Sequence, residues 1–261
     1  MLIQEVIEVI ERFAPLHWQA DFDNSGLTCG DPRRELSSVL LCIDITEEVV
    51  TEAIGLGANL IISHHPLLFR GLKQVTPATG VERSLILAIK HDIVLYAAHT
   101  NIDVVDRGVS GRMADKLQLL HREILYPGEG AGPPRGYGIV GELDAPVESR
   151  LFLARLKEIF HCPSLRHTSL HVPFIRQVAV CGGAGSSFIH AAIAHEADIY
   201  ISGDFKYHDF FLAENRVIIA DIGHYESEQF TKDIFYELLT EKIAKFAVRF
   251  SEINTNPINY L

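Results

Sequence analysis

The chain has 261 residues, of which 48% are hydrophobic and 22% are charged, so its composition fits a globular protein of one large or two modest domains. Its formal net charge of −11 disfavours sequence-independent nucleic-acid binding, which needs a positive field. No apolar run is long enough to span a membrane, and the first residues are acidic where a signal peptide is basic, so we expect a cytoplasmic protein.

Helices and strands are predicted to alternate through the first half of the chain. Apolar side chains recur at helical spacing in residues 2–13, which predicts a helix, and the turn-rich segment 21–27 follows. The next predicted elements are a strand at 38–44, a helix at 46–57, a strand at 59–63, a helix at 81–92 and a strand at 93–99. Thr46 is expected to cap its helix and Gly57 to end it. This alternation is typical of an α/β fold.

The glycine- and proline-rich segment 126–135 is the best candidate for a boundary within the chain. Beyond it the sequence predicts a strand at 136–143, a helix at 147–160 and a strand at 178–183. We therefore expect a first α/β lobe at residues 1–125 and a second at residues 126–261.

The second half of the sequence repeats the first. A shift of 139 residues aligns 39–65 with 178–204 without a gap, and seven of those 27 positions are identical. A shift of 125 then places His99 over His224 and Asp103 over Glu228. We interpret the repeat as an internal duplication that gives two related α/β lobes, with sheets flanked by helices, interleaved around one cleft.

Two further strands are predicted from the apolar runs IYIS (199–202) and VIIADI (217–222). Polar clusters lie at the ends of four predicted strands, at residues 64–65, 99–103, 204–209 and 224–228. Ligands of α/β proteins collect beyond the carboxyl ends of strands, and imidazole and carboxylate groups bind zinc, iron, manganese or nickel. Each cluster taken singly also fits a strand terminus, a capped loop or a solvated helix face. Their shared position at strand ends is what favours a metal site.

The adjacent histidines His64 and His65 would point to opposite faces of a straight strand. At a strand end the chain turns, and Pro66 favours an extended His65, so both rings can border one cleft while reaching different ions of a metal pair. If the chain is helical from Glu226 onward, His224 and Glu228 lie on one helix face. The cysteines are interpreted as buried free thiols rather than ligands: Cys29, Cys42, Cys162 and Cys181.

Seven motifs occur in order: FDNSGLTCGD, LIISHHPLLFRGL, LYAAHTNID, GYGIVGEL, VAVCGGAG, ISGDFKYHD and DIGHYESE. Together they resemble the NIF-three-like family (NGG-one interacting factor three-like), whose members are also called GTP cyclohydrolase 1 type 2 homologs. The resemblance implies a dinuclear metal centre and a toroidal hexamer. Matched motif by motif, it implies five ligands in this chain: His64, His65, Asp103, His224 and Glu228.

We expect one histidine of the pair to bind each divalent ion and Glu228 to bridge the two ions. His99 and His208 are candidates for proton transfer or for orienting the ligands. The resulting hypothesis is a metal-dependent hydrolase acting on a nucleotide or another phosphorylated small molecule. A non-catalytic metal-binding or metal-delivery protein and an interaction scaffold stay open as alternatives, because the ligand set alone does not separate them.

Overall fold

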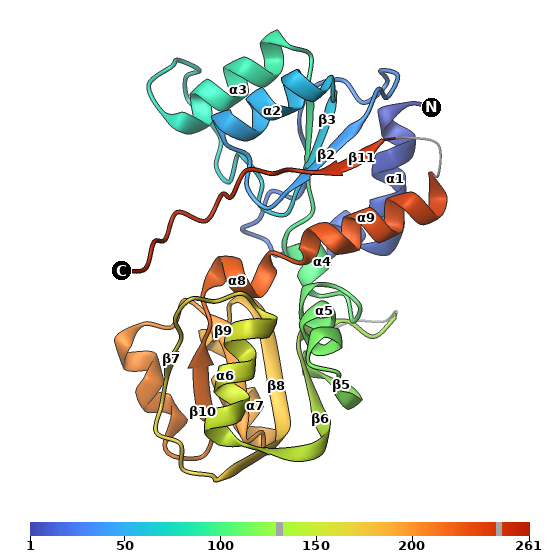
Figure 1. The fold of residues 1–261 in the computed structure, drawn as a ribbon. Helices are drawn as coiled ribbons and strands as arrows, with labels where there is room; N and C mark the ends of the chain where they lie inside the picture. The colour runs from blue at the N-terminus through green and yellow to red at the C-terminus, as the bar shows by residue number, and fades with distance from the viewer. Residues whose placement is uncertain (129–132, 244–246) are drawn as a thin grey trace. The chain divides into compact units, whose positions relative to one another are not determined.

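The computed structural model describes residues 1–128, 133–243 and 247–261, and the chain forms two compact units (Figure 1). Unit 1 comprises Met1–Ile102 and Thr231–Pro257, and unit 2 comprises Asp103–Phe230 and Ile258–Leu261. Within the described ranges, no helix combines the length and the apolar character needed to cross a bilayer.

Unit 1 is built on a five-stranded sheet. Its strands lie in the order β1 (Gly26–Cys29), β4 (Val94–Ala97), β3 (Leu60–Ser63), β2 (Val39–Cys42) and β11 (Val248–Phe250). All neighbours pair in parallel except β1, which is antiparallel to β4. The central strands are buried along their whole length, as their continuous apolar runs predict for a sheet covered on both faces.

Helices α2 (Glu47–Leu56) and α3 (Gly80–Lys90) pack together on one face of this sheet, over a core of aliphatic side chains. Helices α1 (Ile3–Phe13) and α9 (Thr231–Lys242) contact each other, and Figure 1 shows them on the opposite side of the strands from α2 and α3. The predicted boundaries of α2 are confirmed. Thr46 Oγ1 accepts a hydrogen bond from the Val49 backbone N at 3.3 Å, and Gly57 ends the helix in the left-handed conformation.

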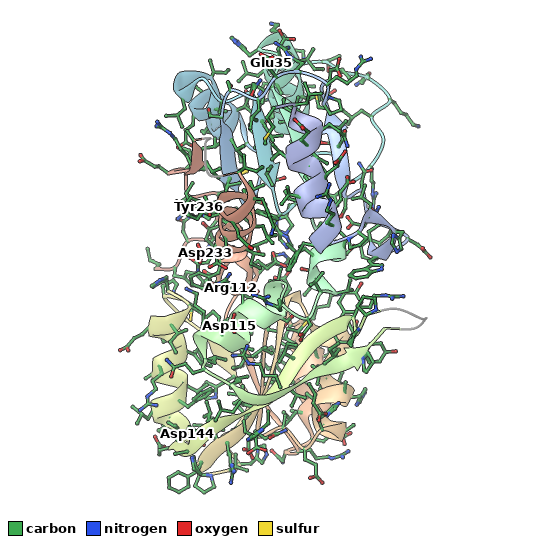
Figure 2. All side chains as sticks on the ribbon, turned by 90° about the vertical axis from the view of Figure 1, so that its right-hand side faces the viewer. Glu35, Arg112, Asp115, Asp144, Asp233 and Tyr236 are labelled. Carbon is green, nitrogen blue, oxygen red and sulfur yellow. The ribbon has the colours of Figure 1, made fainter. Side chains whose placement is uncertain are left out.

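Two elements in the C-terminal part of the chain differ from the sequence expectation. The helix expected to continue from Glu226 is interrupted, because α8 (His224–Glu228) ends before α9 begins at Thr231. Strand β11 was not predicted. Its Phe250 stacks on Tyr236 of α9 with ring centroids 5.0 Å apart, and Tyr236 is labelled on its helix in Figure 2. A three-residue strand carries too short a periodic pattern to be recognised from sequence, and β11 is defined by its parallel pairing with β2.

Unit 2 is built on a six-stranded sheet. Its order is β5 (Leu120–Pro127), β6 (Gly136–Glu148), β8 (Phe174–Ala184), β9 (Ile199–Gly203), β10 (Ile218–Asp221) and β7 (Arg166–His167). Helices α5 (Val109–Lys116) and α6 (Ser149–Ile159) share one core with the sheet. The other core includes residues of α7 (Ile189–Ala194) and of the 3-10 helix η3 (Tyr207–Ala213). The predicted strand at 136–143 and helix at 147–160 are both present, with shifted ends.

The two units have the same parallel core. Val39 of β2 pairs with Leu60 of β3, and Val178 of β8 pairs with Ile199 of β9, which is the same separation along the chain. Each three-stranded parallel core also carries a short antiparallel edge strand, β1 beside β4 and β7 beside β10. The duplication inferred from the sequence, and with it the α/β fold class of two related lobes, is therefore confirmed.

One detail of the repeat was wrong. The registers align Val94 of β4 with Ile218 of β10, one residue short of the shift that places His99 over His224. His99 therefore corresponds to Gly223, which has a φ of 99° and turns the chain into α8. The second half uses this additional glycine between strand and helix, so His224 follows its strand one residue later than His99 does.

The division between the units lies elsewhere than at the expected position 125/126, which falls inside β5. Of the glycine- and proline-rich segment, residues 129–132 lie outside the described residues. The units divide at 102/103, 230/231 and 257/258, and at the first two divisions a helix of one half of the sequence belongs to the unit built mainly from the other half. Helix α5 packs on β6 and β8 of unit 2, and α9 packs on α1 and β11 of unit 1.

Candidate metal centre

The histidine pair of unit 1 lies where β3 ends. The backbone N–H of His64 donates to the carbonyl of Cys42, the last residue of β2, at 3.3 Å. The backbone N–H of His65 donates to the carbonyl of the next residue, Ile43, at 3.0 Å. The chain then turns, because Ser63 Oγ donates to the His65 carbonyl at 2.7 Å. The two ring centroids are 4.8 Å apart, so the rings lie together rather than on opposite faces. This confirms that both rings border the same space.

Both rings of the pair are held through Nδ1. His64 Nδ1 lies 2.9 Å from the Ala98 carbonyl, which can only accept, so His64 carries its proton on Nδ1. His65 Nδ1 lies 2.8 Å from Asp44 Oδ1, and the other oxygen of Asp44 accepts from Thr255 Oγ1 at 2.6 Å. Such contacts are how metal-binding histidines are fixed, because they leave the Nε2 lone pair of the neutral ring directed at the ion.

His99 completes a cluster of three imidazoles in unit 1. Its ring centroid is 5.3 Å from that of His64 and from that of His65, and the three ligating nitrogens lie within 4.8 Å of one another. Its Nδ1 is 2.8 Å from Asp23 Oδ1. Burial raises the pKa of the Asp23 carboxyl, but hydrogen bonds from His99 and Thr100 outweigh it and hold that pKa well below its usual range.

In unit 2 the matching strand ends carry a different set of side chains, one imidazole with carboxylates. His224 begins α8, with its Nδ1 2.8 Å from Oδ2 of Asp204, which follows β9. One helical turn later, Glu228 places Oε2 3.1 Å from His224 Nε2. The predicted i, i+4 relation of these two side chains is therefore confirmed. Imidazole nitrogen and carboxylate oxygen are two of the donor types that divalent-metal sites use.

Space for Glu228 comes from a glycine. Gly183 in β8 has a φ of 65°, and a Cβ on it would lie 2.3 Å from Glu228 Oε1. The Gly183 N–H donates to Ser227 Oγ at 2.9 Å, and Ser227 Oγ donates to the His224 carbonyl at 2.7 Å. The strand end thus binds α8 directly and leaves a recess for the Glu228 carboxylate, and His224 Cε1 lies 3.5 Å from the same Cβ position.

Asp103 also belongs to unit 2, as the last residue of α4 (Thr100–Asp103). Burial, and after it the negative charges of Asp103 and Glu228, raise the pKa of the Cys181 thiol to about 12. Both carboxylates therefore lie near the end of β8. The four cysteines form no disulfides, and three of them are buried. The five expected ligands are thus divided, with His64 and His65 in unit 1 and Asp103, His224 and Glu228 in unit 2.

His208 is placed differently from the other candidates. It lies exposed on η3, where its ring contacts Tyr207 and Phe211 with centroids 5.2 and 6.1 Å away. His99, the other candidate for proton transfer, is within the three-imidazole cluster of unit 1. The geometry therefore favours His99 for a role beside the ligands.

Sequence reasoning placed Asp204 in a polar cluster but gave no orienting role to the three carboxylates that hold the histidines: Asp23, Asp44 and Asp204. Asp44 is the last residue of the strand predicted at 38–44, and Asp204 comes directly after the apolar run IYIS, so their position at a carboxyl end was a usable signal. Asp23 gave no such signal. It lies in a turn-rich segment that reaches His99 only through the pairing of β1 with β4.

Comparison with known proteins identifies, along almost the whole chain, the same family that the sequence motifs resemble. The family model of Duf34/NIF3 (NGG1p interacting factor 3) matches residues 1–257. A Streptococcus pneumoniae protein named GTP cyclohydrolase 1 type 2 homolog is 34% identical, with both chains covered completely. A protein of the same name from Clostridium perfringens is 35% identical, over 87% of each chain.

Solved structures share the fold. A Bacillus cereus protein related to NIF3 superposes with a TM-score of 0.91 at 24% identity, over 100% of this chain and 99% of that one. Reduced HcgD from Methanocaldococcus jannaschii gives a TM-score of 0.82 at 28% identity, over 97% of this chain and 98% of that one.

Proposed function

This chain belongs to the Duf34/NIF3 family, and from that premise we propose that it is a metal-dependent hydrolase with two divalent ions per chain. Its substrate is a nucleotide or another phosphorylated small molecule. The ligands are His64 and His65 from unit 1 and Asp103, His224 and Glu228 from unit 2.

One observation carries the proposal: the histidines at strand ends are all held through Nδ1 by an oxygen acceptor. The acceptor is a backbone carbonyl for His64 and a carboxylate for His65, His99 and His224. A ring that only filled space would not need its tautomer fixed in this way. Repeating the arrangement four times supports a site built to present Nε2 to an ion.

The donor set suits the proposed ions. Imidazole nitrogens with carboxylate oxygens accept zinc, iron, manganese or nickel, and geometry alone does not choose among them. We assign one histidine of the pair to each ion and Glu228 to the bridge, since it is buried and its recess at Gly183 fixes it in place. When bound, two such cations lower the pKa of a coordinated water and stabilise negative charge on a phosphate.

The name GTP cyclohydrolase 1 type 2 homolog, given to the relatives from Streptococcus pneumoniae and Clostridium perfringens, supports a nucleotide as substrate. The negative net charge of this chain favours binding a nucleotide through cations rather than through a basic surface.

The test replaces Glu228 by Gln, with Glu158→Gln on the exposed surface of α6 as the matched control. Elemental analysis of reconstituted wild-type protein should give about two ions per chain, as a dinuclear site requires. Glu228→Gln should lose metal and turnover on a panel of nucleotides and phosphoesters, whereas Glu158→Gln should keep both.

Two results would contradict the proposal in different ways. Turnover that survives in Glu228→Gln after metal is lost would show that the centre is not catalytic. A fully metal-loaded wild-type protein without turnover on any substrate of the panel would point instead to metal binding or delivery, or to a scaffold.

We also propose that the chain forms a homo-oligomer, a hexamer by the resemblance of its motifs to the NIF-three-like family. Light scattering coupled to size-exclusion chromatography measures this directly. A monomeric mass at micromolar concentration would refute it.

A further inference from the structure

Asp23 is the most completely satisfied carboxylate beside the three imidazoles of unit 1. Its side chain has no exposed surface. Five donors reach its two oxygens at 2.5–3.0 Å: His99 Nδ1, Asn24 N, Ser25 Oγ, Thr100 N and Thr100 Oγ1. A buried carboxylate with this many donors stays ionised and has no freedom to rotate.

The fold brings this aspartate to His99 through strand pairing. Gly26, the first residue of β1, pairs antiparallel with Ala97, the last residue of β4. Counting backward along β1 and forward from β4 therefore sets Asp23 beside His99 and Thr100. The Asp23 N–H donates to the Ala20 carbonyl at 2.9 Å, which closes the turn that carries the carboxylate inward.

Unit 2 has the same strand pairing without the same pair of side chains. Arg166, the first residue of β7, pairs with Asp221, the last residue of β10. The position equivalent to Asp23 is then Pro163, and the position equivalent to His99 is Gly223. The duplicated fold therefore forms without an aspartate–histidine pair at this place, and its presence in unit 1 calls for a chemical reason.

We propose that Asp23 is a positioning residue that fixes His99 with its proton on Nδ1, so that Nε2 transfers protons in the reaction; this rests on the hydrolase function proposed above. As the oxygen of a water molecule bonds to the phosphorus or carbon of the substrate, Nε2 takes a proton from that water. The imidazolium then gives this proton to the leaving atom as its bond breaks. Asp23 remains ionised and stabilises the imidazolium without taking the proton itself.

His99 is suited to this role by its surroundings. It is close to His64 and His65, the proposed ligands, and its ring meets the half-exposed ring of Phe69 edge to face with centroids 5.4 Å apart. Its side chain is 13% exposed, so it is shielded and yet reachable by a small molecule. A substrate bound at the proposed ions would therefore have the Nε2 of His99 beside it.

The experiment measures the tautomer of His99 directly. Nitrogen-15 NMR of metal-free protein distinguishes a protonated from an unprotonated ring nitrogen, and the signals lost in His99→Gln identify that ring. In Asp23→Asn, the amide NH₂ faces Nδ1 and should move the proton of His99 to Nε2. The matched control Asp44→Asn should change the tautomer of His65 and leave His99 as it is.

Turnover with both ions bound gives the second readout. Asp23→Asn and His99→Gln should each lower kcat about 100- to 10,000-fold, as the loss of a proton-transfer group does. The double variant should be no slower than His99→Gln, because the two residues act as one unit. If Asp23→Asn does not fold, His99→Gln still tests the proton-transfer role through kcat and metal content.

Three results would overturn the inference. These are a His99 tautomer that is unchanged in Asp23→Asn, a kcat that is unchanged in His99→Gln, and a loss of bound metal in His99→Gln, which would make His99 a ligand. Absence of turnover in the wild-type protein refutes the proposed function and the proton transfer together, whereas the NMR result separately decides whether Asp23 positions His99.

Discussion

The two units share a parallel core of matching register, but their strand ends carry different chemistry. At the end of β3, unit 1 has His64 and His65, whereas the repeat positions at the end of β9 in unit 2 are Gly203 and Asp204. Unit 1 therefore presents imidazoles and uses aspartates to orient them. Unit 2 presents one imidazole with carboxylates, and the aspartate at the repeat position of His65 orients His224 instead.

A second pair of positions makes the same point. Asp44, which holds His65 in unit 1, matches Gly183 in the sequence repeat. In unit 2 the missing side chain at Gly183 is what gives Glu228 its place. The same position of the repeat therefore has two roles. In unit 1 the Asp44 side chain contacts His65, and in unit 2 the absence of a side chain at Gly183 leaves room for Glu228. The duplicated sheet is therefore common to both units, whereas single side chains determine which functional groups lie at its strand ends.

The largest effect is expected from filling the recess in unit 2. Gly183→Ala should lower the free energy of unfolding by about 2–4 kcal/mol, because its Cβ meets Glu228 and alanine is strained at this φ. Metal binding should weaken with it, since the glutamate must move. Urea denaturation and metal titration measure the two effects.

Gly55→Ala in α2 is the control for this substitution, because a Cβ there meets nothing within 4 Å. It should leave the protein unchanged or stabilise it by up to about 1 kcal/mol, the usual gain in a helix. Equal destabilisation by both substitutions would show that the recess has no special role.

Removing the orienting carboxylates tests the histidine arrangement in each unit. Asp44→Asn and Asp204→Asn should each weaken metal binding about 10- to 100-fold. The loss should be larger for Asp44, since it is 35% exposed and anchored by Thr255, whereas Asp204 is 51% exposed. Competition with a chromogenic chelator gives the affinities.

The surface variant Asp31→Asn removes the charge of Asp31 from its exposed ion pair with Arg33 and should bind metal like the wild type. If Asp204→Asn were the more damaging of the two, the idea that burial sets the strength of the orienting contact would be wrong.

A smaller effect concerns the helix that follows the first strand of each core. Thr46 caps α2 with its side chain, while the matching Gly185 caps the 3-10 helix η2 (Ser186–Phe188) without one. Thr46→Ala should cost about 1 kcal/mol, and Thr46→Gly, which copies unit 2, only a few tenths. Chemical denaturation of both variants measures the difference. If Thr46→Gly lowered the free energy of unfolding more than Thr46→Ala does, the role of Thr46 as a helix cap would not explain the effect.

The smallest difference between the two units is expected in the reactivity of two cysteine thiols. Cys42 and Cys181 occupy the same repeat position and are both buried, and burial raises the pKa of each thiol. Neither should react with an alkylating reagent under native conditions, whereas the half-buried Cys29 should react slowly. Mass spectrometry after labelling identifies the modified residues, and labelling of either buried thiol in folded protein would contradict the structure.

Much of the fold could be predicted because its signals are local. Helix α2 has its cap, its acidic first turn and its terminating glycine within twelve consecutive residues. Short strands were harder. β7 has two residues and β11 has three, so neither carries a periodic pattern, and each is defined by the longer strand beside it.

The sequence by itself determined the duplication, the α/β class and the side chains at the strand ends, because identical spacings and local motifs need no knowledge of distant contacts. Only the tertiary structure decided that His99 corresponds to Gly223, since strand register depends on hydrogen bonds between segments far apart in the chain. It also decided which acids orient which histidines. Asp23 and His99 are 76 residues apart in the chain, and only the antiparallel pairing of β1 with β4 brings them into contact.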